Sequence, residues 1–373
     1  MAESTRLVDL VQLGVDGFLA ERATEFEAIA PELLRFTDAA GDLLAGGKRF
    51  RALFCYWGWQ AVRTTGDGFD PMPDADASAD LPAVVHAATA LEVFHAAALV
   101  HDDIMDRSDT RRGKPAAHRR FEREHRDAGW RGDAETFGQS AALLLGDLLL
   151  GWSDELFDRG TAVLGSPEAG RAGRVEFNRM RTEVTAGQYL DILEEHSWIT
   201  QDDRQALPRA QRVIVYKSAK YSVEAPLAIG AALGGGTLPQ LAALRAFGLP
   251  LGIAYQLRDD MLGVFGDPSV TGKPAGDDLR EGKRTVLIAL ARQLLPSSTR
   301  NLVDELLGDP ELDDQQVEML RTALRDCGAV ARVEQVIDRE VARSREAIAD
   351  APITASARAQ LTQLADTVTR RVA

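Results

Sequence analysis

Three aspartates close the most apolar stretch of the sequence, in the run His101-Asp102-Asp103-Ile104-Met105-Asp106. In a helix, Asp102, Asp103 and Asp106 would share one face, because residues three and four apart are neighbours. Stability does not explain them, since aspartate is a poor helix former and carboxylates repel one another and the negative end of a helix. A divalent cation offsets these costs, and Mg²⁺ prefers one or two carboxylates completed by water and phosphate oxygens. The run therefore predicts a metal site.

A second acidic pair, Asp259 and Asp260, follows Gln256 at the end of another apolar run, 247–255. A single Asp-Asp pair is explained equally well as a solvated helix end. Two such clusters, each closing an apolar helix, instead favour a shared function. We expect their helices to place the carboxylates face to face across a cavity.

Basic residues gather in a few segments around these acidic ones. Only six of the 43 basic residues are lysine, namely Lys48, Lys114, Lys217, Lys220, Lys273 and Lys283. A chain that otherwise uses arginine has a specific demand, we infer, for the compact charge of lysine at these positions. Carboxylates with Lys and Arg at the mouth of an apolar cavity indicate a bound diphosphate, shared by metal and cationic side chains.

Composition and charge narrow the class of protein. The 43 basic against 57 acidic residues give a net charge of −14, a poor match for nucleic acid or an anionic membrane. Cys55 and Cys327 make no disulfide framework and the N-terminus lacks a secretory pattern, so we expect a cytoplasmic protein. The apolar stretches 81–101 and 225–244 are interpreted as buried core helices rather than membrane spans, the second broken at 234–236.

Helical periodicity dominates the chain, and alternation with period two is nearly absent. The predicted helices lie within 5–36, 81–106, 139–158, 174–196, 207–230, 238–264, 284–295, 313–325, 329–350 and 354–372. The segment 64–80 is predicted to be a surface loop insertion, and 107–137, 160–172 and 266–282 to be connections. We therefore predict an all-α fold with residues 1–373 in a single large helical domain.

Six segments, in this order, resemble the trans-isoprenyl diphosphate synthase (polyprenyl synthetase) family, and look most similar to bacterial geranylgeranyl diphosphate synthases. They are G-G-K-R-F-R (46–51), H-D-D-I-M-D-R-S-D-T-R-R-G (101–113), G-Q-Y-L-D (187–191), K-S-A (217–219), Y-Q-L-R-D-D (255–260) and G-K-P-A-G-D-D-L-R-E-G-K-R-T (272–285). The resemblance is strong over about residues 40–290. It implies an isoprenoid synthase-type fold around a deep central cavity, usually a homodimer. The implied reaction is head-to-tail, 1′-4 condensation of isopentenyl diphosphate with an allylic diphosphate.

The resemblance also implies a role for each matching residue. Three Mg²⁺ per active site are expected, with Mn²⁺ as an alternative, at Asp102, Asp103, Asp106, Asp259 and Asp260. Contacts to the allylic diphosphate fall to Arg111, Lys217 and Lys273, and contacts to isopentenyl diphosphate to Lys48, Arg51, His95 and Arg112, with Lys283 close to one of the two. Stabilisation of the allylic cation falls to Lys217, Ser218 and Gln256, and the central-helix motif to Gln188 and Asp191. The implied catalytic residues are Lys217, Ser218 and Gln256 together with Asp102, Asp106 and Asp259.

Two positions depart from the family pattern. Gly263 stands where the second motif usually has its last aspartate, and Ser218 stands where threonine is common. Because Asp259 is present, we expect activity to be retained, with weaker binding of the third metal.

Product length should follow the steric depth below the first aspartates. Ala98 and Ala97, four and five residues before Asp102, are too small to block a growing chain. Phe94 lies one turn deeper, about 12 Å from Asp102 along a helix, and is the candidate floor, although simple core packing accounts for it equally. This pattern predicts a C20 product, geranylgeranyl diphosphate, with C25 or longer as the alternative.

Three other functions compete with this one. A class I terpene cyclase would carry an N-D-x-x-S-x-x-x-E-like second motif, which is absent, and would not need the second diphosphate site indicated by Lys48, Arg51 and Arg112. A non-catalytic subunit of a heteromeric prenyltransferase would have eroded aspartate motifs, and Gly263 is the one erosion. The third is an acidic helical scaffold that merely binds Mg²⁺ or Ca²⁺.

Overall fold

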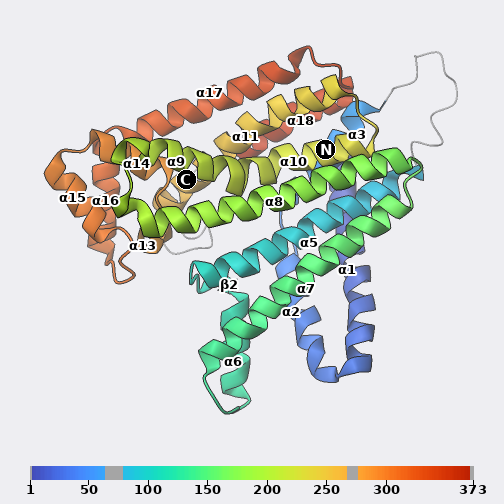
Figure 1. Ribbon diagram of the computed structural model, residues 1–373, viewed down its shortest axis with the longest axis horizontal. Helices are drawn as coiled ribbons and strands as arrows, with labels where there is room; N and C mark the ends of the chain where they lie inside the picture. Colours follow the sequence, from blue (N-terminus) through green and yellow to red (C-terminus); the bar gives the residue numbers. More distant parts are fainter. Residues whose placement is uncertain (1, 64–78, 267–275, 370–373) are drawn as a thin grey trace. The chain divides into compact units, whose positions relative to one another are not determined.

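The computed structural model describes residues 2–63, 79–266 and 276–369, and this part of the chain is almost wholly helical (Figure 1). Its strands are β1 (Thr110–Arg111) and β2 (Lys114–Pro115), which pair antiparallel across a tight turn. The all-α fold class is therefore confirmed. Most of the predicted loop 64–80, and Lys273, lie outside the described residues.

The described chain divides into two compact units. The first comprises the residues up to Val175 together with Pro226–Thr237, and the second comprises Glu176–Ala225 together with the chain from Leu238 onward. Two such units can belong to one folding domain, so the single domain over 1–373 stays a prediction.

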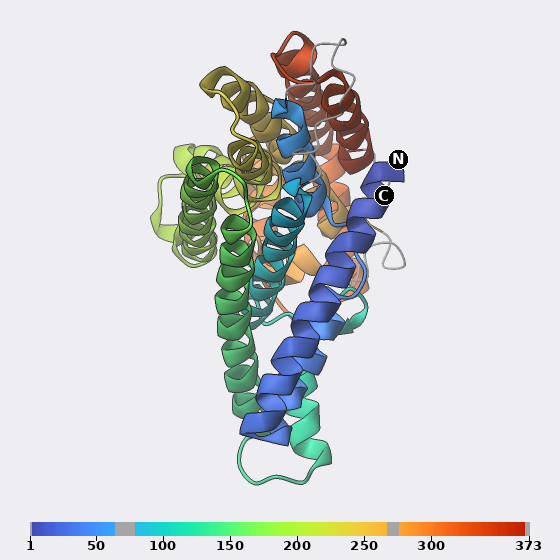
Figure 2. The ribbon, with the colours of Figure 1, turned by 90° about the vertical axis from the view of Figure 1, so that its right-hand side faces the viewer.

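Long helices build the first unit. They are α1 (Ala2–Ile29), α2 (Leu34–Leu44), α3 (Phe50–Val62), α5 (Leu81–Met105), α6 (Ala117–Asp127) and α7 (Ala134–Ala162), with a 3₁₀ turn η1 (Pro31–Leu33) between the first two. Figure 2 shows α1, α5 and α7 side by side, while α3 packs on α5 and α6 on α7. Helix α5 thereby becomes the core of this unit.

Helix α5 is long and apolar enough to cross a membrane by length and composition alone. In the structure, 72% of its most apolar window is buried inside the protein. Its own buried residues lie on nearly every side of the helix, which is the pattern of a core helix. The interpretation of 81–101 as a core helix is thus confirmed.

Helices α3 and α10 (Ala225–Leu233) approach each other at the level of their backbones. A methyl group at Gly230 would lie 1.8 Å from the carbonyl oxygen of Cys55, and one at Gly58 would lie 2.3 Å from that of Leu227. Only glycine fits at either position, so this crossing fixes how α3, and the basic segment before it, are held in the first unit.

The second unit is built from the remaining helices. They are most of α8 (Pro167–Ser197), η2 (Trp198–Thr200), η3 (Asp203–Gln205), α9 (Ala206–Val213), the π-helical segment η4 (Ile214–Glu224), α11 (Leu238–Phe265), α13 (Asp277–Glu281), α14 (Val286–Leu294), α15 (Ser297–Leu306), α16 (Asp314–Asp326), α17 (Ala329–Ala349) and α18 (Ala355–Thr369). Helix α11 packs on η4 and on α17, and the last two helices run beside it (Figure 1). Its core is one continuous apolar cluster that extends from α9 to α17.

Four expectations about helix boundaries were wrong. Segment 107–137 is not only a connection, because α6 occupies Ala117–Asp127 with Ala117, Phe121 and His125 turned inward at four-residue spacing. Segment 160–172 already contains the first turns of α8, and α13 lies inside 266–282. The continuous pattern 5–36 breaks at Ala30, where the extended residue precedes Pro31.

Arg245 on α11 is the counter-ion of two buried carboxylates in the second unit. Its guanidinium lies 2.5 Å from Glu176 Oε2 and 3.0 Å from Glu224 Oε1, and these glutamates are only 8% and 6% exposed. We expect Arg245→Ala to lower the free energy of unfolding by about 3 kcal/mol, because it removes the counter-ion of buried Glu224 and leaves Glu176 with Arg179 at 3.4 Å. Denaturant unfolding measures this, and Arg332→Ala, on the exposed face of α17, should cost less than about 0.5 kcal/mol. Equal losses in the two variants would contradict this role of Arg245.

Candidate active site

Helix α5 ends in a tight, defined turn that holds its acidic side chains. The amide of Asp106 donates to the carbonyl of Asp102 at 2.8 Å, and the amide of Ser108 donates to the carbonyl of Asp103 at 3.0 Å. Arg107 takes the left-handed conformation, with φ of 55°, at the position where glycine usually ends a helix in this way. The turn therefore fixes the backbone from which the three predicted aspartate side chains project.

Backbone strain concentrates around this turn. In the described residues, the non-glycine positions with positive φ are Arg49, Arg107 and Arg112, and each lies in or next to a predicted site segment. A left-handed non-glycine residue costs roughly 1 kcal/mol, and such strain persists where the surroundings impose it, often at functional sites.

The aspartates of the first cluster differ in environment. Asp103 is fully buried, and the Nε atom of Arg111 donates to its Oδ1 at 2.8 Å. The same guanidinium lies 3.5 Å from Asp102 Oδ2, while Asp102 and Asp106 are half-buried. Asp103 thus orients Arg111, whereas Asp102 and Asp106 are partly exposed at the helix end.

A cluster of positive charge surrounds His95, which lies two helical turns before Asp102 on α5. Burial is the main cause of a His95 pKa well below 6.5, and the charges of Arg51, Arg112 and Arg111 lower it further. The pKa of Arg112 is also lowered, first by burial, and among its charged neighbours are Arg49 and Arg51. Like charges held this close without a bound anion are costly, so the cluster is suited to receive one. The structure brings Arg51, His95, Arg111 and Arg112 together, and their assignment to the two diphosphates stays a prediction.

The neutral state of His95 makes stability depend on pH. Unfolded His95 takes up a proton near pH 6.5, whereas folded His95 does so only at lower pH, so the unfolded state binds more protons below pH 6.5 and stability falls there. We expect His95→Gln to remove part of this fall, up to about 1.4 kcal/mol per pH unit. Denaturant unfolding of both proteins between pH 5 and 7 measures it, and parallel curves would contradict the assignment.

Arg49 and Glu92 form a buried ion pair that was not among the predicted site residues. Arg49 Nη1 donates to Glu92 Oε2 at 3.3 Å, and the other glutamate oxygen accepts from the amide of Ala52 at 3.2 Å. Glu92 is the single charged residue of the apolar stretch 81–101, which is the signal that could have pointed to a buried partner. The pair fastens the start of α3, and with it Arg51, to α5.

In the second unit, the second acidic pair lies near the end of α11. Asp259 is exposed and Asp260 is 9% exposed, with the amide nitrogen of Gln256 donating to Asp260 Oδ1 at 2.7 Å. The pKa of Asp260 is raised to about 8, chiefly by burial and also by the charges of Asp278 and Asp259. A cation at this end of α11 would relieve that repulsion.

Lys217 and Ser218 lie on η4, the π-helical segment. Lys217 Nζ donates to Asp191 Oδ2 of α8 at 2.5 Å, so the central-helix motif and the K-S-A motif meet. Such wide helical turns are rare and are frequent at functional sites. The structure thereby groups Lys217, Ser218 and Asp191 within the second unit.

Two glycines hold this segment from opposite partners. A methyl group at Gly187 of α8 would lie 2.3 Å from the backbone nitrogen of Lys217, and one at Gly252 of α11 would lie 2.4 Å from the carbonyl oxygen of Ala219. Both helices therefore contact the backbone of η4 directly on either side of Ser218. The quoted motif G-Q-Y-L-D already contained Gly187, but nothing in the sequence marked Gly252.

The remaining predicted lysines have different environments. Lys48 is exposed, with Nζ 6.0 Å from the ring centroid of Phe50. Lys283 Nζ lies 2.7 Å from Glu281 and 3.9 Å from Asp278, so a diphosphate there would compete with carboxylates. Gln188 is half-buried on α8.

The three predicted chain-length residues lie on α5 as expected. Phe94 is 4% exposed and Ala97 is fully buried, whereas Ala98 is half-buried. The assignment of Phe94 as a floor stays a prediction, because a core role requires the same burial.

The donor set fits a hard divalent cation that is completed by substrate. No group of three or more Asp, Glu, His or Cys side chains within residues 2–63, 79–266 and 276–369 forms a finished metal-binding cluster. The predicted ligands are carboxylates alone, and Mg²⁺ takes few carboxylates together with water and phosphate oxygens. Asp102 and Asp106 at one helix end suit that chemistry.

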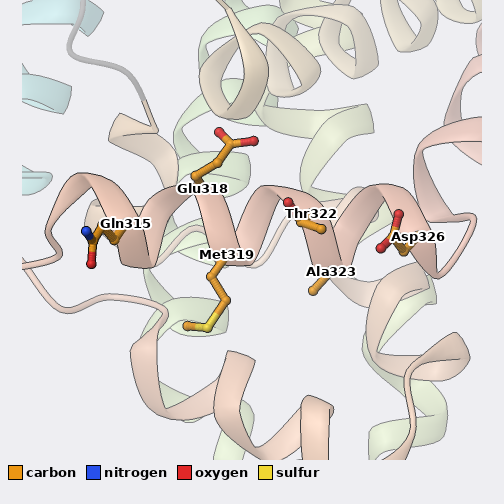
Figure 3. A pocket seen from close by; sticks show the side chains of 6 residues that line it. All are labelled: Gln315, Glu318, Met319, Thr322, Ala323 and Asp326. Carbon is orange, nitrogen blue, oxygen red and sulfur yellow. The ribbon is translucent and has the colours of Figure 1, made fainter.

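A shallow hollow on the outer face of α16 holds none of the predicted residues. Figure 3 shows the side chains that line it, namely Gln315, Glu318, Met319, Thr322, Ala323 and Asp326, all from this one helix. It lacks any basic side chain for a diphosphate, so it does not compete with the site above.

Known proteins place the chain in a family. The polyprenyl synthetase family model matches residues 35–324, which is well over half of this chain. The protein is thus a trans-prenyltransferase, as the resemblance implied, and the chain belongs to the polyprenyl synthetase family.

Individual relatives cover nearly the whole chain. A geranylfarnesyl diphosphate synthase from Aeropyrum pernix is 30% identical over 93% of this chain and 97% of its own. A geranylgeranyl diphosphate synthase from Methanosarcina mazei is 28% identical, covering 85% and 86%. The crystal structure of a geranylgeranyl pyrophosphate synthase from Corynebacterium glutamicum, complexed with isoprenyl diphosphate and magnesium, has a TM-score of 0.88 and 36% identity, covering 98% and 99%.

Proposed function

We propose that this enzyme condenses isopentenyl diphosphate head-to-tail with an allylic diphosphate and releases all-trans geranylgeranyl diphosphate, a C20 product. The observation that carries the proposal is the cluster of Arg51, His95, Arg111 and Arg112, which gathers positive charge beside Asp102 at the end of α5. A similar protein with a solved structure is named a geranylgeranyl pyrophosphate synthase, which supports the C20 product.

In the first unit, Asp102 and Asp106 are proposed to hold magnesium on the allylic diphosphate, with Asp103 in support. Magnesium supplies Lewis-acid stabilisation of the diphosphate as it leaves. Arg51, His95 and Arg112, with Lys48, are proposed to bind isopentenyl diphosphate, and Arg111 to contact the allylic diphosphate. Neutral His95 donates a hydrogen bond there without adding another positive charge.

In the second unit, Asp259 and Asp260 are proposed to serve a third magnesium, with Mn²⁺ as a substitute. Lys217 and Lys273 would bind the allylic diphosphate, and Lys283 would lie close to a diphosphate. A backbone carbonyl of η4 near Lys217 and Ser218, and the amide oxygen of Gln256, would stabilise the allylic cation. The amide nitrogen of Gln256 already donates to Asp260, so its oxygen is the atom suited to that role.

The deciding experiment incubates the purified protein with Mg²⁺, isopentenyl diphosphate and, separately, the C5, C10 and C15 allylic diphosphates, and sizes the products. A C20 product is expected from each allylic partner. A C25 product is the second candidate, favoured by the likeness to the geranylfarnesyl diphosphate synthase. Absence of any product from the protein alone would instead support a non-catalytic subunit.

We also propose that the protein works as a homodimer in the cytoplasm. Leu143 and Leu144 on α7 are 51% and 56% exposed, and adjacent exposed apolar side chains of this size favour a second copy as partner. The mass in solution, from light scattering, should be twice that of the chain, and Leu144→Asp should shift it toward the monomer. A monomeric wild-type protein would overturn this proposal.

A further inference from the structure

Arg49 joins four helices of the first unit. It is the residue directly before α3, and its backbone is left-handed, with φ of 48°. Its guanidinium donates to Gln12 Oε1 of α1 at 2.7 Å, to the carbonyl oxygen of Leu44 at the end of α2, and to Glu92 Oε2 of α5 at 3.3 Å. Arg49 and Glu92 are each only 6% exposed, so this junction lies inside the protein.

Glu92 also caps the start of α3 from another helix. The side chain of Arg49, which occupies the N-cap position, makes no capping hydrogen bond. Instead, Glu92 Oε1 accepts from the amide of Ala52, in the first turn of α3, at 3.2 Å. A carboxylate is favoured there because the first amides of a helix lack partners within the helix and the helix dipole is positive at that end. One buried side chain on α5 therefore holds both the residue before α3 and its first turn.

Three of the residues proposed to bind isopentenyl diphosphate are attached to this junction through the backbone. Lys48 directly precedes Arg49, and Arg51 lies in the first turn of α3. His95 follows Glu92 by three residues on α5, so the two are neighbours on the helix surface. A shift at the ion pair would therefore move Lys48 and Arg51 relative to His95.

The fourth such residue, Arg112, contacts the loop between α2 and α3. Its Nη1 atom donates to the carbonyl oxygen of Leu43 at 3.5 Å, and a methyl group at Gly47 would lie 3.6 Å from the same nitrogen. Burial lowers the pKa of Arg112, and the charge of Glu92 acts in the opposite sense. The loop that Arg49 pins therefore also supports Arg112, and Glu92 lies close enough for its charge to act there.

A role in stability alone explains this junction less well. Burying both charges of an ion pair costs desolvation, so such a pair commonly adds no stability over well-packed apolar side chains. The left-handed backbone of Arg49 is a further cost for a residue other than glycine. Both costs fall at the place where the proposed ligands of one substrate meet, which favours a functional reason for them.

We propose that the Arg49–Glu92 ion pair positions the isopentenyl diphosphate site. Arg49 ties α1 and α2 to the start of α3, and Glu92 ties that start to α5, so both are positioning residues. The inference rests on the proposed function, because it concerns the binding of one of the two substrates. Asp102 lies ten residues beyond Glu92, about 15 Å further along α5, so the allylic diphosphate should be affected far less.

The first test is Glu92→Gln, which keeps the size of the side chain and removes its charge. We expect the dissociation constant of isopentenyl diphosphate, measured by calorimetry on the full-length protein, to rise about 10–100-fold, the effect of misplacing one hydrogen bond to a charged group. KM for isopentenyl diphosphate should rise likewise, while kcat and KM for the C15 allylic diphosphate stay within about threefold. An unchanged dissociation constant would overturn the proposal.

The direction of the change separates positioning from a simple effect of charge. Glu92 places negative charge beside a basic cluster, so its removal from an otherwise unmoved site would strengthen the attraction for a diphosphate. Weaker binding by Glu92→Gln therefore indicates that the site has lost its geometry. Tighter binding would show that Glu92 acts only through its charge, and would overturn the proposal.

Glu122→Gln is the matched control. Glu122 on α6 is 4% exposed and forms ion pairs with Arg119 and Arg126, so the substitution removes an equally buried and paired carboxylate from the same unit. Its dissociation constant for isopentenyl diphosphate should stay within about twofold of the wild type. An equal rise in both variants would trace the effect to a general loss of stability and contradict the role of Glu92.

The double variant Arg49→Met with Glu92→Met decides if Glu92→Gln fails to fold. It replaces the whole pair by apolar side chains of similar length, which buried sites commonly tolerate because no charge is left without a partner. Weaker binding of isopentenyl diphosphate by the folded double variant supports the proposal. Binding as tight as in the wild type would show that the pair serves stability alone.

The readout separates this proposal from the proposed function, because binding needs no turnover. A wild-type protein that binds isopentenyl diphosphate but makes no prenyl product would refute the reaction and leave the result on the ion pair valid. Normal product formation, with wild-type binding of isopentenyl diphosphate by Glu92→Gln, would refute only the role of the pair.

Discussion

Asp102→Ala is expected to lower kcat/KM by about 10³-fold or more, the size of effect seen when a preorganised electrostatic group is removed from a reaction centre. Asp102 lies at the end of α5, half-buried, with the guanidinium of Arg111 at 3.5 Å. The substitution removes a proposed magnesium ligand and keeps the ion pair of Arg111 with Asp103. The diphosphate would then leave without full charge compensation.

Steady-state kinetics with isopentenyl and allylic diphosphates measure this loss. Asp127→Asn, an exposed acid at the end of α6, has the same charge change and should retain full turnover. The unfolding midpoint of Asp102→Ala should not fall, since the repulsion within the cluster is relieved. Near-normal turnover of Asp102→Ala would remove this residue from the metal site.

Ala98→Phe is expected to shift the main product from C20 to C15 or shorter, while Phe94→Ala should lengthen it. Ala98 is the half-buried position one turn above Asp102, and a phenyl ring there would fill space in which a growing prenyl chain could extend. Phe94 lies one turn further from the aspartates and is 4% exposed. Its removal would open about the volume of a ring below the chain.

Chromatography of the products of both variants, with the C5 allylic diphosphate as substrate, measures the change. Ala97→Phe is less suitable, because Ala97 is fully buried and the larger ring would damage the core. Unchanged product length in both variants would show that Phe94 is only a core residue. A shortened product in Ala98→Phe without lengthening in Phe94→Ala would place the floor elsewhere.

The long helices could be predicted because their apolar runs are far longer than a strand. Helix α5 runs over Leu81–Met105 against the predicted 81–106, and α11 over Leu238–Phe265 against 238–264. Helix α3 was not predicted because ten of its residues are buried all round, which removes the periodic contrast. Helix α6 was not predicted for the opposite reason, since charged residues hide its narrow inward stripe.

The site residues could be predicted by type but not by their partners. The aspartate runs and the basic segments are visible because helix stability cannot explain them. Nothing in the sequence shows that Arg111 binds Asp103, or that Asp278 fills the space at Gly263, since these contacts join segments that only the fold brings together. The π-helical form of η4 was also hidden, because it depends on helices packing against it.

The contacts of Gly187 and Gly252 with η4 limit where this enzyme can be made more thermostable. Replacing helical glycines by alanine is a common route to thermostability, because it restricts the unfolded chain, often by about 0.4–1 kcal/mol. Gly17 and Gly151 offer open space for such a methyl group. Gly187 and Gly252 do not, and alanine at either would push directly on the backbone that carries Lys217 and Ser218. Stabilising substitutions should therefore be made at Gly17 and Gly151, and Gly187 and Gly252 should be left unchanged.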